Sequence, residues 1–187
     1  KVRISAENVM NYVKNNPKKV LSGPLRYAKK LYLNGDLVEN LVIPEGVTEI
    51  ASHAFNDYTW LTSITLPKSL RKIGGGAFDE CNNLSEVHIS DIVAWCEIEF
   101  ESYSSNPLRY AKNLYVNGEL FENFVLPEGV TEIVNSAFKY CRSLTSITLP
   151  KSLRKIGENA FYECGGLTEI IIPEDVTEIA ADAFCNC

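Results

Sequence analysis

The sequence predicts a strand-rich α/β solenoid, in which short parallel strands of successive coils stack on one side and short turns close the other. The first observation is an internal duplication: residues 22–90 align without a gap with residues 105–173 and are identical at 45 of the 69 positions. The second is a shorter period of 23 residues, marked by the prolines that open its segments: Pro44, Pro67, Pro127, Pro150 and Pro173. Nested repeats of this kind predict one supersecondary unit that is stacked many times.

Each segment follows the pattern P-x-x-[VL]-x-x-I-x-x-x-A-F-x-x-C-x-x-L-x-x-[IV]-x-[IL], which predicts the elements of one coil. Val47 and Ile50 mark a first short extended side that points inward. The Ala-Phe pair and the cysteine three residues later favour a helical or 3₁₀ turn. Ile64 and Leu66 then lie two residues apart around Thr65, which is the period of a strand. The next proline ends that strand and turns the chain.

A coil of this size does not bury its apolar residues alone, so each coil is stabilised mainly by its two neighbours. The period of 23 residues falls within the range of leucine-rich repeats, about 20 to 29, and outside that of helical-pair repeats. The sequence therefore predicts a leucine-rich-repeat solenoid with short parallel strands.

We expect the chain to form one such solenoid that starts inside an earlier copy of the repeat, because KVRIS and VMNYV echo EVHIS and IVAWC further along. The predicted parts are a partial N-terminal repeat at 1–21, a first large repeat at 22–90, the connecting part of an insertion at 91–104, a second large repeat at 105–173 and an incomplete last coil at 174–187.

Residues 90–126 depart from the period. Here Leu-Tyr-Val precedes Asn117-Gly118, which predicts a hairpin because Asn-Gly adopts the positive φ angles of a type I′ turn. Leu-Tyr-Leu before Asn34-Gly35 repeats this signal, so two hairpin insertions are predicted. We expect the insertion to leave the solenoid and rejoin it near Leu126. Residues 92–102 alternate apolar and acidic residues, and either a strand or a short helix fits them.

Charges alternate along the stack of coils. Acidic and basic versions of one heptapeptide follow each other: PEGVTEI at 44–50, PKSLRKI at 67–73, PEGVTEI at 127–133, PKSLRKI at 150–156 and PEDVTEI at 173–179. Glu49 is therefore expected beside Lys72, Glu45 beside Lys68, and Lys155 between two glutamates. Such cross-strand pairs contribute about 0.2 to 1 kcal/mol each. We interpret them as a device that fixes the register of the coils.

Composition excludes several classes of partner. The 187 residues include 18 Lys and Arg against 24 Asp and Glu, which gives a net charge of −6 and an isoelectric point near 5.0. Such a chain has no general attraction to polyanions, so no nucleic-acid partner is expected. It contains no run of about 18 apolar residues, so no membrane insertion is expected. It opens without a signal segment, so the residues alone do not give the compartment.

The cysteine place of the repeat is occupied by four of the six cysteines: Cys81, Cys141, Cys164 and Cys187. A small buried thiol serves there as an apolar filler. Parallel coils hold equivalent Cβ atoms about 4.8 Å apart, which is wider than the roughly 3.8 Å of a disulfide, so free thiols are predicted. Whether Cys96, Cys185 or Cys187 forms a disulfide stays open.

No catalytic residue, metal site or cofactor is predicted. His53 and His88 are the only histidines, and neither has a recurring acid or serine partner. The triple glycine at 74–76 does not form a phosphate loop, because Gly74 matches Gly157 whereas the other two glycines match Glu and Asn. It is interpreted as a conformationally permissive corner.

The AFxxC turn, the LxxIxLP strand and the NPLRYAKNLYVNGEL insertion resemble the BspA-like leucine-rich repeats of bacterial cell-surface proteins over nearly the whole chain. The resemblance implies a right-handed solenoid, an extracellular location on the bacterial surface, and adhesion to host matrix proteins or other cells. It carries over no catalytic motif and fixes no binding residue.

Two surfaces are candidates for a partner. On the strands, the side chains that alternate with buried residues are expected to face outward, and solenoids commonly bind partners there. The candidates on this surface are Ser63, Thr65, Glu86, His88, Ser146, Thr148 and Glu169. The alternative is an ordinary solvated strand surface, which also carries serine and threonine.

The second candidate is the inserted hairpin, where three side chains recur in the two copies: Arg26, Tyr27 and Tyr32, and then Arg109, Tyr110 and Tyr115. Tyrosine and arginine are enriched at protein interfaces, and tyrosine stacks on sugars. The alternative is that these tyrosines cover the side of the solenoid. The two copies differ most between residues 51–60 and the equivalent residues 134–143. This difference fits either random drift of an edge that has no function or diversification of an edge that binds a partner.

The sequence thus predicts a non-enzymatic module that binds an extracellular protein or glycan of unknown identity as an adhesion segment. The alternative is a structural spacer that presents another domain of a larger surface protein. We also expect the unfinished coil at 173–187 to expose an apolar edge through which chains associate weakly.

Overall fold

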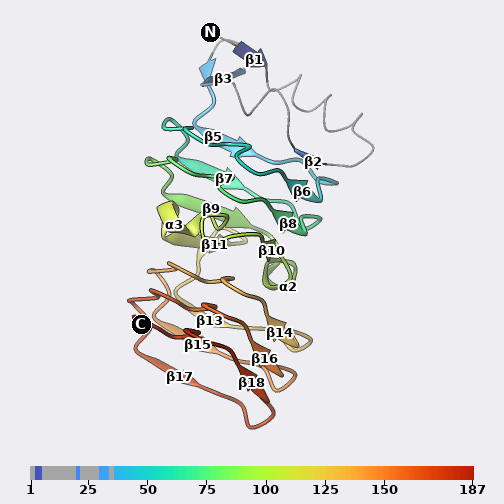
Figure 1. Cartoon of the computed structure of the whole chain (residues 1–187), viewed down its shortest axis with the longest axis vertical. Coiled ribbons are helices and arrows are strands. Elements are labelled where there is room, and N and C mark those ends of the chain that lie inside the picture. Colours follow the sequence, from blue (N-terminus) through green and yellow to red (C-terminus); the bar gives the residue numbers. More distant parts are fainter. Residues whose placement is uncertain (1–2, 6–19, 22–29, 34–35) are drawn as a thin grey trace.

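The computed structural model describes residues 3–5, 20–21, 30–33 and 36–187. In this part the chain winds into coils that stack along the long axis of the molecule, with the last coil at the opposite end from the N-terminus (Figure 1). The predicted strand-rich solenoid with parallel strands is confirmed.

Two sheets form the strand face of the solenoid. The first has four parallel strands and an antiparallel edge strand: β5 (Asn40–Val42), β7 (Ser63–Thr65), β9 (Glu86–Ile89), β11 (Asn113–Val116) and β12 (Glu119–Leu120). The second has three parallel strands: β13 (Asn123–Val125), β15 (Ser146–Thr148) and β17 (Glu169–Ile171). The register places Ile64 between Leu41 and Val87, and all three side chains are buried. The strand period predicted from the sequence is therefore correct.

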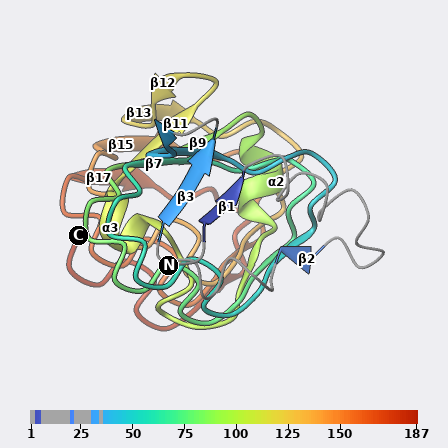
Figure 2. The same ribbon diagram turned by 90° about the horizontal axis from the view of Figure 1, so that it is seen from above.

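Shorter strands line a second side. They form two parallel sheets: β2 (Val20–Leu21), β6 (Glu49–Ile50), β8 (Lys72–Ile73) and β10 (Glu99–Phe100), and then β14 (Glu132–Ile133), β16 (Lys155–Ile156) and β18 (Glu178–Ile179). A small sheet at the N-terminal end joins β1 (Arg3–Ser5), β3 (Lys30–Leu33) and β4 (Asp36–Leu37). Seen from above, the coils superpose around a common interior (Figure 2). The apolar side chains of both faces fill that interior, as at Ile50 and Ile73.

The Ala-Phe turns correct one expectation, because none of those described forms a helix or a 3₁₀ helix. Each contains single i to i−3 hydrogen bonds, such as Ala54 N to Ala51 O at 3.1 Å, but residues with positive φ interrupt the run. These left-handed residues precede the Ala and follow the Phe by two: His53, Asp57, Gly76, Glu80, Ser136, Tyr140, Asn159, Glu163, Asp182 and Asn186. Alternate amides therefore point along the stack, and Phe55 N donates to Ala77 O at 2.8 Å.

The phenylalanines of these turns form columns in the interior. Phe138 lies between Phe121 and Phe161, with ring centroids 5.1 and 5.3 Å away and nearly parallel planes. Phe55 and Phe78 stack in the same way at 5.4 Å. Stacked rings of successive coils thus extend the core along the solenoid axis.

The cysteines are free thiols in the structure. Cys81 Sγ donates to the carbonyl of Phe55 in the preceding coil at 3.2 Å, and Cys164 Sγ donates to that of Phe138 at 3.1 Å. Burial raises the pKa of Cys81 to about 12 and that of Cys141 to about 11. The neutral S–H therefore persists at neutral pH and serves as an apolar filler with one weak hydrogen bond.

Residues 92–116 complete a coil, so the expectation that the insertion leaves the solenoid is wrong. Helix α2 (Ile92–Cys96) and strand β10 take the place of one short extended side, and β10 pairs in parallel with β8. Helix α3 (Leu108–Ala111) replaces an Ala-Phe turn, and β11 then pairs in parallel with β9. The physical reason is burial, since Trp95 and Leu108 are almost inaccessible. Both alternatives for 92–102, helix and strand, are realised in turn.

Only the tip of the insertion leaves the coil. Asn117 and Gly118 have φ angles of 53° and 86°, as a type I′ turn requires, and β12 folds back on β11. This hairpin projects beyond the outline of the coils in the view from above (Figure 2). Strands β3 and β4 form the other predicted hairpin, whose turn at 34–35 lies outside the described residues.

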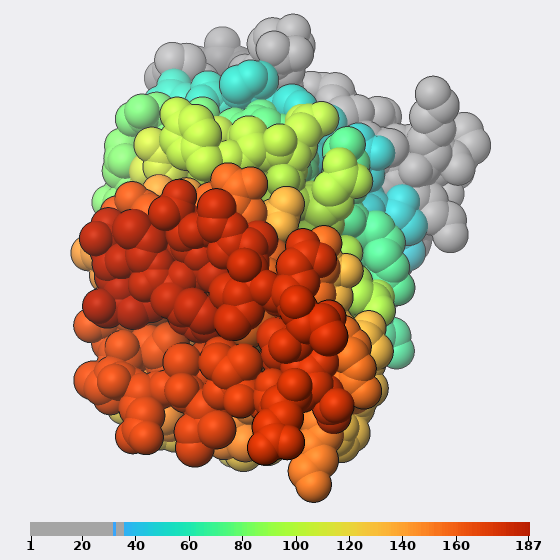
Figure 3. Space-filling model, turned by 60° about the horizontal axis from the view of Figure 1, so that its bottom comes forward, coloured from blue at the N-terminus to red at the C-terminus, as the bar shows by residue number. Residues whose placement is uncertain are grey.

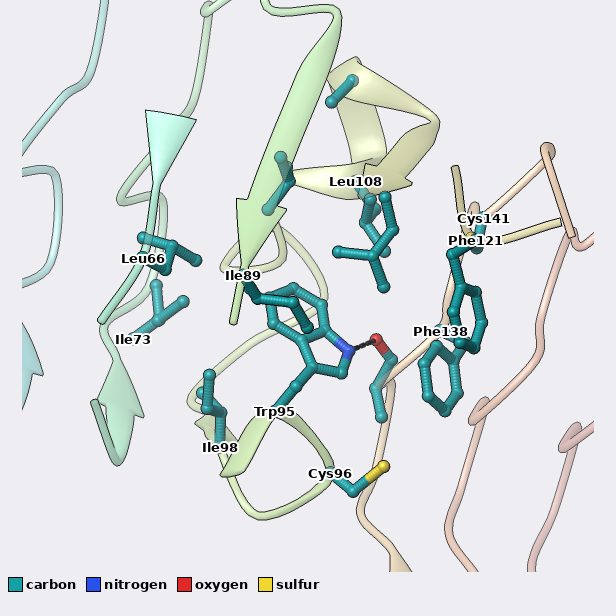
Figure 4. Close-up of a cluster of buried hydrophobic side chains, with 14 of the residues drawn as sticks. Leu66, Ile73, Ile89, Trp95, Cys96, Ile98, Leu108, Phe121, Phe138 and Cys141 are labelled. Carbon is teal, nitrogen blue, oxygen red and sulfur yellow. Dashed lines mark hydrogen bonds between the residues drawn. The ribbon is translucent and has the colours of Figure 1, made fainter. Parts of the chain in front are cut away.

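Side chains join the inserted coil to its neighbours in addition to backbone bonds such as Val134 N to Cys96 O at 3.3 Å. Trp95 Nε1 donates to the carbonyl of Ala137 at 3.0 Å, and its ring lies between the coil of Ile89 and the Phe121–Phe138 pair (Figure 4). On the other side, Ser104 Oγ accepts a hydrogen bond from the Gly76 amide at 3.2 Å. The two halves of the solenoid are therefore connected through buried side chains.

The alternating charges lie in the predicted register. Lys155 Nζ is 3.4 Å from Glu132 Oε1 and 3.5 Å from Glu178 Oε1. Lys72 lies opposite Glu49 in the sheet, and its ammonium forms an ion pair at 3.1 Å with Glu99 of the inserted coil. Each of these exposed ion pairs contributes little to stability. If two acidic or two basic coils became neighbours, however, like charges would lie opposite each other and repel.

The corner at 74–76 is permissive at Gly76, which has a φ angle of 63°, whereas Gly74 and its counterpart Gly157 are required by close packing. A Cβ atom on Gly74 would lie 2.3 Å from the backbone nitrogen of Ser52, and one on Gly157 would lie 2.6 Å from that of Asn135. Successive coils therefore approach at this corner more closely than any side chain allows.

At the C-terminal end, the last coil shows the apolar edge that was expected. Ile179 is 50% exposed, whereas its register partner Ile156 is buried. Residues near the C-terminus form the red surface at the front of the molecule in Figure 3. Association of chains through this edge stays a prediction.

Candidate interaction surfaces

The strand face carries two rows of outward side chains. One row contains Asn40, Ser63, Glu86 and Asn113, followed by Asn123, Ser146 and Glu169 in the second sheet. The other contains Val42, Thr65, His88 and Tyr115, followed by Val125, Thr148 and Ile171. Every one of these residues is partly or fully exposed, so the structure places the strand candidates outward as predicted. Their role in binding stays a prediction.

The first row satisfies much of its hydrogen bonding internally. Ser63 Oγ donates to Asn40 Oδ1 at 2.8 Å, and Thr62 Oγ1 donates to the same oxygen at 3.1 Å. The second copy repeats this geometry, with Ser146 Oγ 2.9 Å from Asn123 Oδ1. These side chains are consequently held in fixed orientations on the surface.

An aromatic pair interrupts the second row. The rings of His88 and Tyr115 stack with centroids 4.7 Å apart and planes 16° from parallel. His88 Nε2 lies 3.0 Å from Glu86 Oε2, which orients the imidazole. Beside the pair, Leu120 of the hairpin is 40% exposed. We call this stack of two rings, with a carboxylate and an apolar side chain beside it, the aromatic platform.

Sequence reasoning placed His88 on a strand and Tyr115 in an insertion and did not bring them together. The signal that could have done so is alternation, since Leu114-Tyr115-Val116 repeats the apolar-outward-apolar order of Val87-His88-Ile89. A coil that returns to the sheet at β11 makes these segments neighbours.

The predicted set of hairpin residues is divided by the structure. Tyr115 lies in the hairpin, whereas Arg109 and Tyr110 lie in α3, on the edge formed by the turns. Tyr110 Oη accepts a hydrogen bond from the Glu80 amide at 3.0 Å, so it replaces the backbone acceptor that the next coil provides elsewhere. Tyr110 thus covers the side of the solenoid, which was the alternative interpretation.

In the first copy, Arg26 and Tyr27 lie outside the described residues. Tyr32 lies in β3, opposite Ser5 of β1 and Leu37 of β4.

Large apolar side chains are exposed on the same strand face. Val125 and Ile171 are 68% and 76% exposed. A shallow hollow of about 760 Å³ lies over β15 and β17, and Ser146, Thr148, Glu169 and Ile171 contribute to its lining. The strand face therefore combines apolar contact area with fixed polar groups, as protein-binding surfaces do.

Among the described residues, no group of three or more His, Cys, Asp and Glu side chains converges as metal ligands do. None of the helices in that part of the chain is long and apolar enough to cross a bilayer.

The family model for the BspA type leucine rich repeat region matches residues 28–110 and 109–187, in six copies. The chain belongs to the BspA-type leucine-rich-repeat family. This confirms the resemblance drawn from the AFxxC turn and the LxxIxLP strand. The BspA-type family is typically a non-enzymatic repeat scaffold, and its members are often cell-surface proteins.

Solved structures of leucine-rich proteins match the chain over most of its length. A leucine rich cell surface protein from Faecalibacterium prausnitzii is 30% identical, with 80% of this chain and 45% of that chain covered and a TM-score of 0.47. The T. pallidum leucine rich repeat protein TpLRR is 31% identical, with coverages of 80% and 55% and a TM-score of 0.35. The chain thus spans about half the length of these proteins. No curated protein matches it.

Proposed function

We propose that the chain is a non-enzymatic binding module of the bacterial cell surface, which recognises an extracellular protein or glycan through its strand face. The observation that carries the proposal is the His88–Tyr115 platform, flanked by Glu86 and continuous with the outward rows of both sheets. The extracellular location is supported by the family and by the F. prausnitzii relative, which is named a cell surface protein.

The chemistry of the platform suits recognition. Tyrosine is among the residues that contribute most to binding energy at interfaces, and its amphipathic ring also stacks on sugars. The stack and the Glu86 contact restrict the rotamers of both rings, so little conformational entropy is lost when a partner binds. The fixed serine and asparagine side chains of the first row add oriented hydrogen-bonding groups.

A structural spacer is the second candidate function. The phenylalanine columns and the cross-coil bonds of Asn40 and Asn123 make the stack stiff along its axis, which a spacer requires. In that case the outward polar groups would form hydrogen bonds with one another and would bind no partner.

An array of extracellular-matrix proteins and host glycans tests the proposal. We expect saturable binding at micromolar strength or better by the intact chain, and no binding by a Phe138→Ala chain shown to be unfolded under the assay conditions. Tyr115→Ala, which removes half of the platform, should weaken binding by about tenfold or more, as loss of an aromatic anchor does. Thr131→Ala, at an exposed position beside β14 and away from the strand face, should leave binding unchanged. Silence across the array would favour the spacer.

A further inference from the structure

Cationic and aromatic side chains gather on the turn edge, away from the strand face. The turn-edge cluster comes from three successive coils and consists of Tyr103, Arg109, Tyr110, Lys139, Tyr140 and Tyr162. Arg109 Cζ lies 5.2 Å from the ring centroid of Tyr103 and 5.5 Å from that of Tyr110. Lys139 Nζ lies 4.3 Å from the centroid of Tyr162 and 5.3 Å from that of Tyr140. Both cations therefore lie against aromatic faces.

The two cations of the cluster, Arg109 and Lys139, are close enough for their charges to interact. Burial is the main cause that lowers the pKa of Lys139; the carboxylates of Glu163 and Glu158 raise it in part, and the positive charge of Arg109 lowers it. The Tyr140 and Tyr162 rings meet edge to face at 6.1 Å, which closes the cluster on the Lys139 side. On the other side, Tyr103 is 64% exposed and offers an open ring.

Lys139 is the cation of this cluster without a direct anionic contact, although the carboxylates of Glu163, Glu158 and Asp182 act on it from further away. Arg109 forms an ion pair with Asp79 at 3.3 Å, and Arg142 forms one with Glu163 at 2.9 Å. Lys139 is only 7% exposed, and its Nζ makes no hydrogen bond or ion pair with any residue of the described part of the chain. A buried ammonium without an anionic partner is costly, and aromatic faces compensate it only in part. An incoming anionic group would remove that cost.

The duplication shows that the fold does not require this arrangement. At the equivalent places the first copy carries Asn56 instead of Lys139, Asp57 instead of Tyr140 and Asp79 instead of Tyr162. Asn56 fits the same turn and donates to the carbonyl of Asp79 at 3.3 Å. The Lys139 half of the cluster is thus an addition to one copy, whereas Arg109 and Tyr110 recur in the first copy as Arg26 and Tyr27.

We propose that the turn-edge cluster binds a sugar that carries a single carboxylate, of the sialic-acid or uronic-acid type, with the carboxylate at Lys139 and the sugar ring against the tyrosines. Tyrosine rings stack on the C–H faces of sugars, and an ammonium forms a charge-assisted hydrogen bond with a carboxylate. Lys139 is the one cation of the cluster that makes no ion pair with a described residue, which matches one negative charge on the ligand. Asp79, Glu163 and the net charge of −6 disfavour polyanions.

The inference builds on the proposed binding function but uses a different surface, so either can fail without the other. The test is titration of the chain by isothermal calorimetry and saturation-transfer NMR with 3′-sialyllactose, with a glucuronic-acid disaccharide, and with lactose as the neutral match. We expect at least one acidic sugar to bind about tenfold or more tightly than lactose, which corresponds to about 1.4 kcal/mol. The two acidic probes distinguish the two sources of the carboxylate.

Matched variants come from the duplication. Lys139→Asn installs the residue that the first copy uses and should abolish the preference for acidic sugars while the circular dichroism spectrum stays unchanged. Asn56→Lys places a lysine at the equivalent turn without the tyrosines and should create no second site. Thr131→Ala, at an exposed position beside β14, should leave the preference unchanged.

Equal affinity for lactose and for both acidic sugars would overturn the proposal, as would a preference that survives Lys139→Asn. Tighter binding of a glutamate-rich peptide than of either sugar would also overturn it, because the cluster would then recognise acidic protein. The array and the titrations can also give different answers. If Tyr115→Ala loses the array partners but the chain shows no preference for acidic sugars, the proposed function stands and this inference alone is refuted.

Discussion

Replacement of Phe138 by alanine is expected to lower the free energy of unfolding by about 3 to 5 kcal/mol. The ring is fully buried and lies between Phe121 and Phe161, so its removal opens a cavity in the middle of a column and breaks two stacking contacts. Because each coil is stabilised by its neighbours, the loss extends beyond one turn. Urea denaturation followed by circular dichroism measures the change.

Val125→Ala is the control for this prediction. Val125 is 68% exposed on β13, so its truncation should cost less than about 1 kcal/mol. If the two variants lost similar stability, the phenylalanine column would not be the core of the solenoid.

Trp95→Ala is expected to cost a comparable amount, about 3 to 5 kcal/mol, and to weaken the connection between the two halves of the solenoid. Trp95 is 1% exposed, packs edge to face on Phe100 at 5.6 Å, and donates to the carbonyl of Ala137 in the next coil. With this side chain removed, we expect the urea transition to broaden or to separate into two steps, since nearest-neighbour coupling holds a solenoid together.

Trp95→Phe separates the two contributions of that residue. It keeps an aromatic ring in the junction but removes the N–H donor, and Asn106 Nδ2 still donates to the Ala137 carbonyl at 3.2 Å. We expect a smaller loss and a single transition. A sharp single transition for Trp95→Ala with unchanged stability would show that the junction does not depend on this side chain.

Much of the fold follows from local spacing, because each coil repeats the same few physical requirements. The Ile64 strand, the charges around Lys155 and the Asn117-Gly118 turn all lie as predicted, since a strand period, a charge register and a type I′ turn are each set within a few residues.

The inserted coil was not predictable in the same way. Its sequence lacks the Ala-Phe pair and has Ser90 in place of the proline that opens each other segment. The 23-residue pattern therefore does not reveal that α2 and α3 are the elements that complete this coil. The positions of Tyr110 and Tyr115 relative to the rest of the solenoid depend on that substitution. A pattern that identifies a repeat therefore failed where one coil uses different elements to bury the same interior.

The conformation of the Ala-Phe turns, though not their position, was missed for a different reason. A cluster of short polar residues suggests a turn, but the left-handed conformation is expected mainly for glycine, asparagine and aspartate. Glu80 and Tyr140 adopt it as well, with φ angles of 61° and 69°. The stacking of coils imposes this conformation, because it directs alternate amides toward the carbonyls of the next coil.

The most direct test of the strand face as a binding surface compares two arginine substitutions on the same array. Ser146→Arg places a long cation in the middle of the second sheet, where Ser146 is exposed between Asn123 and Glu169. Thr131→Arg adds the same charge at an exposed position beside β14, away from that face. We expect Ser146→Arg to lose the partners bound by the intact chain and Thr131→Arg to keep them. Partners that survive Ser146→Arg, or that both variants lose equally, would contradict recognition through the strand face.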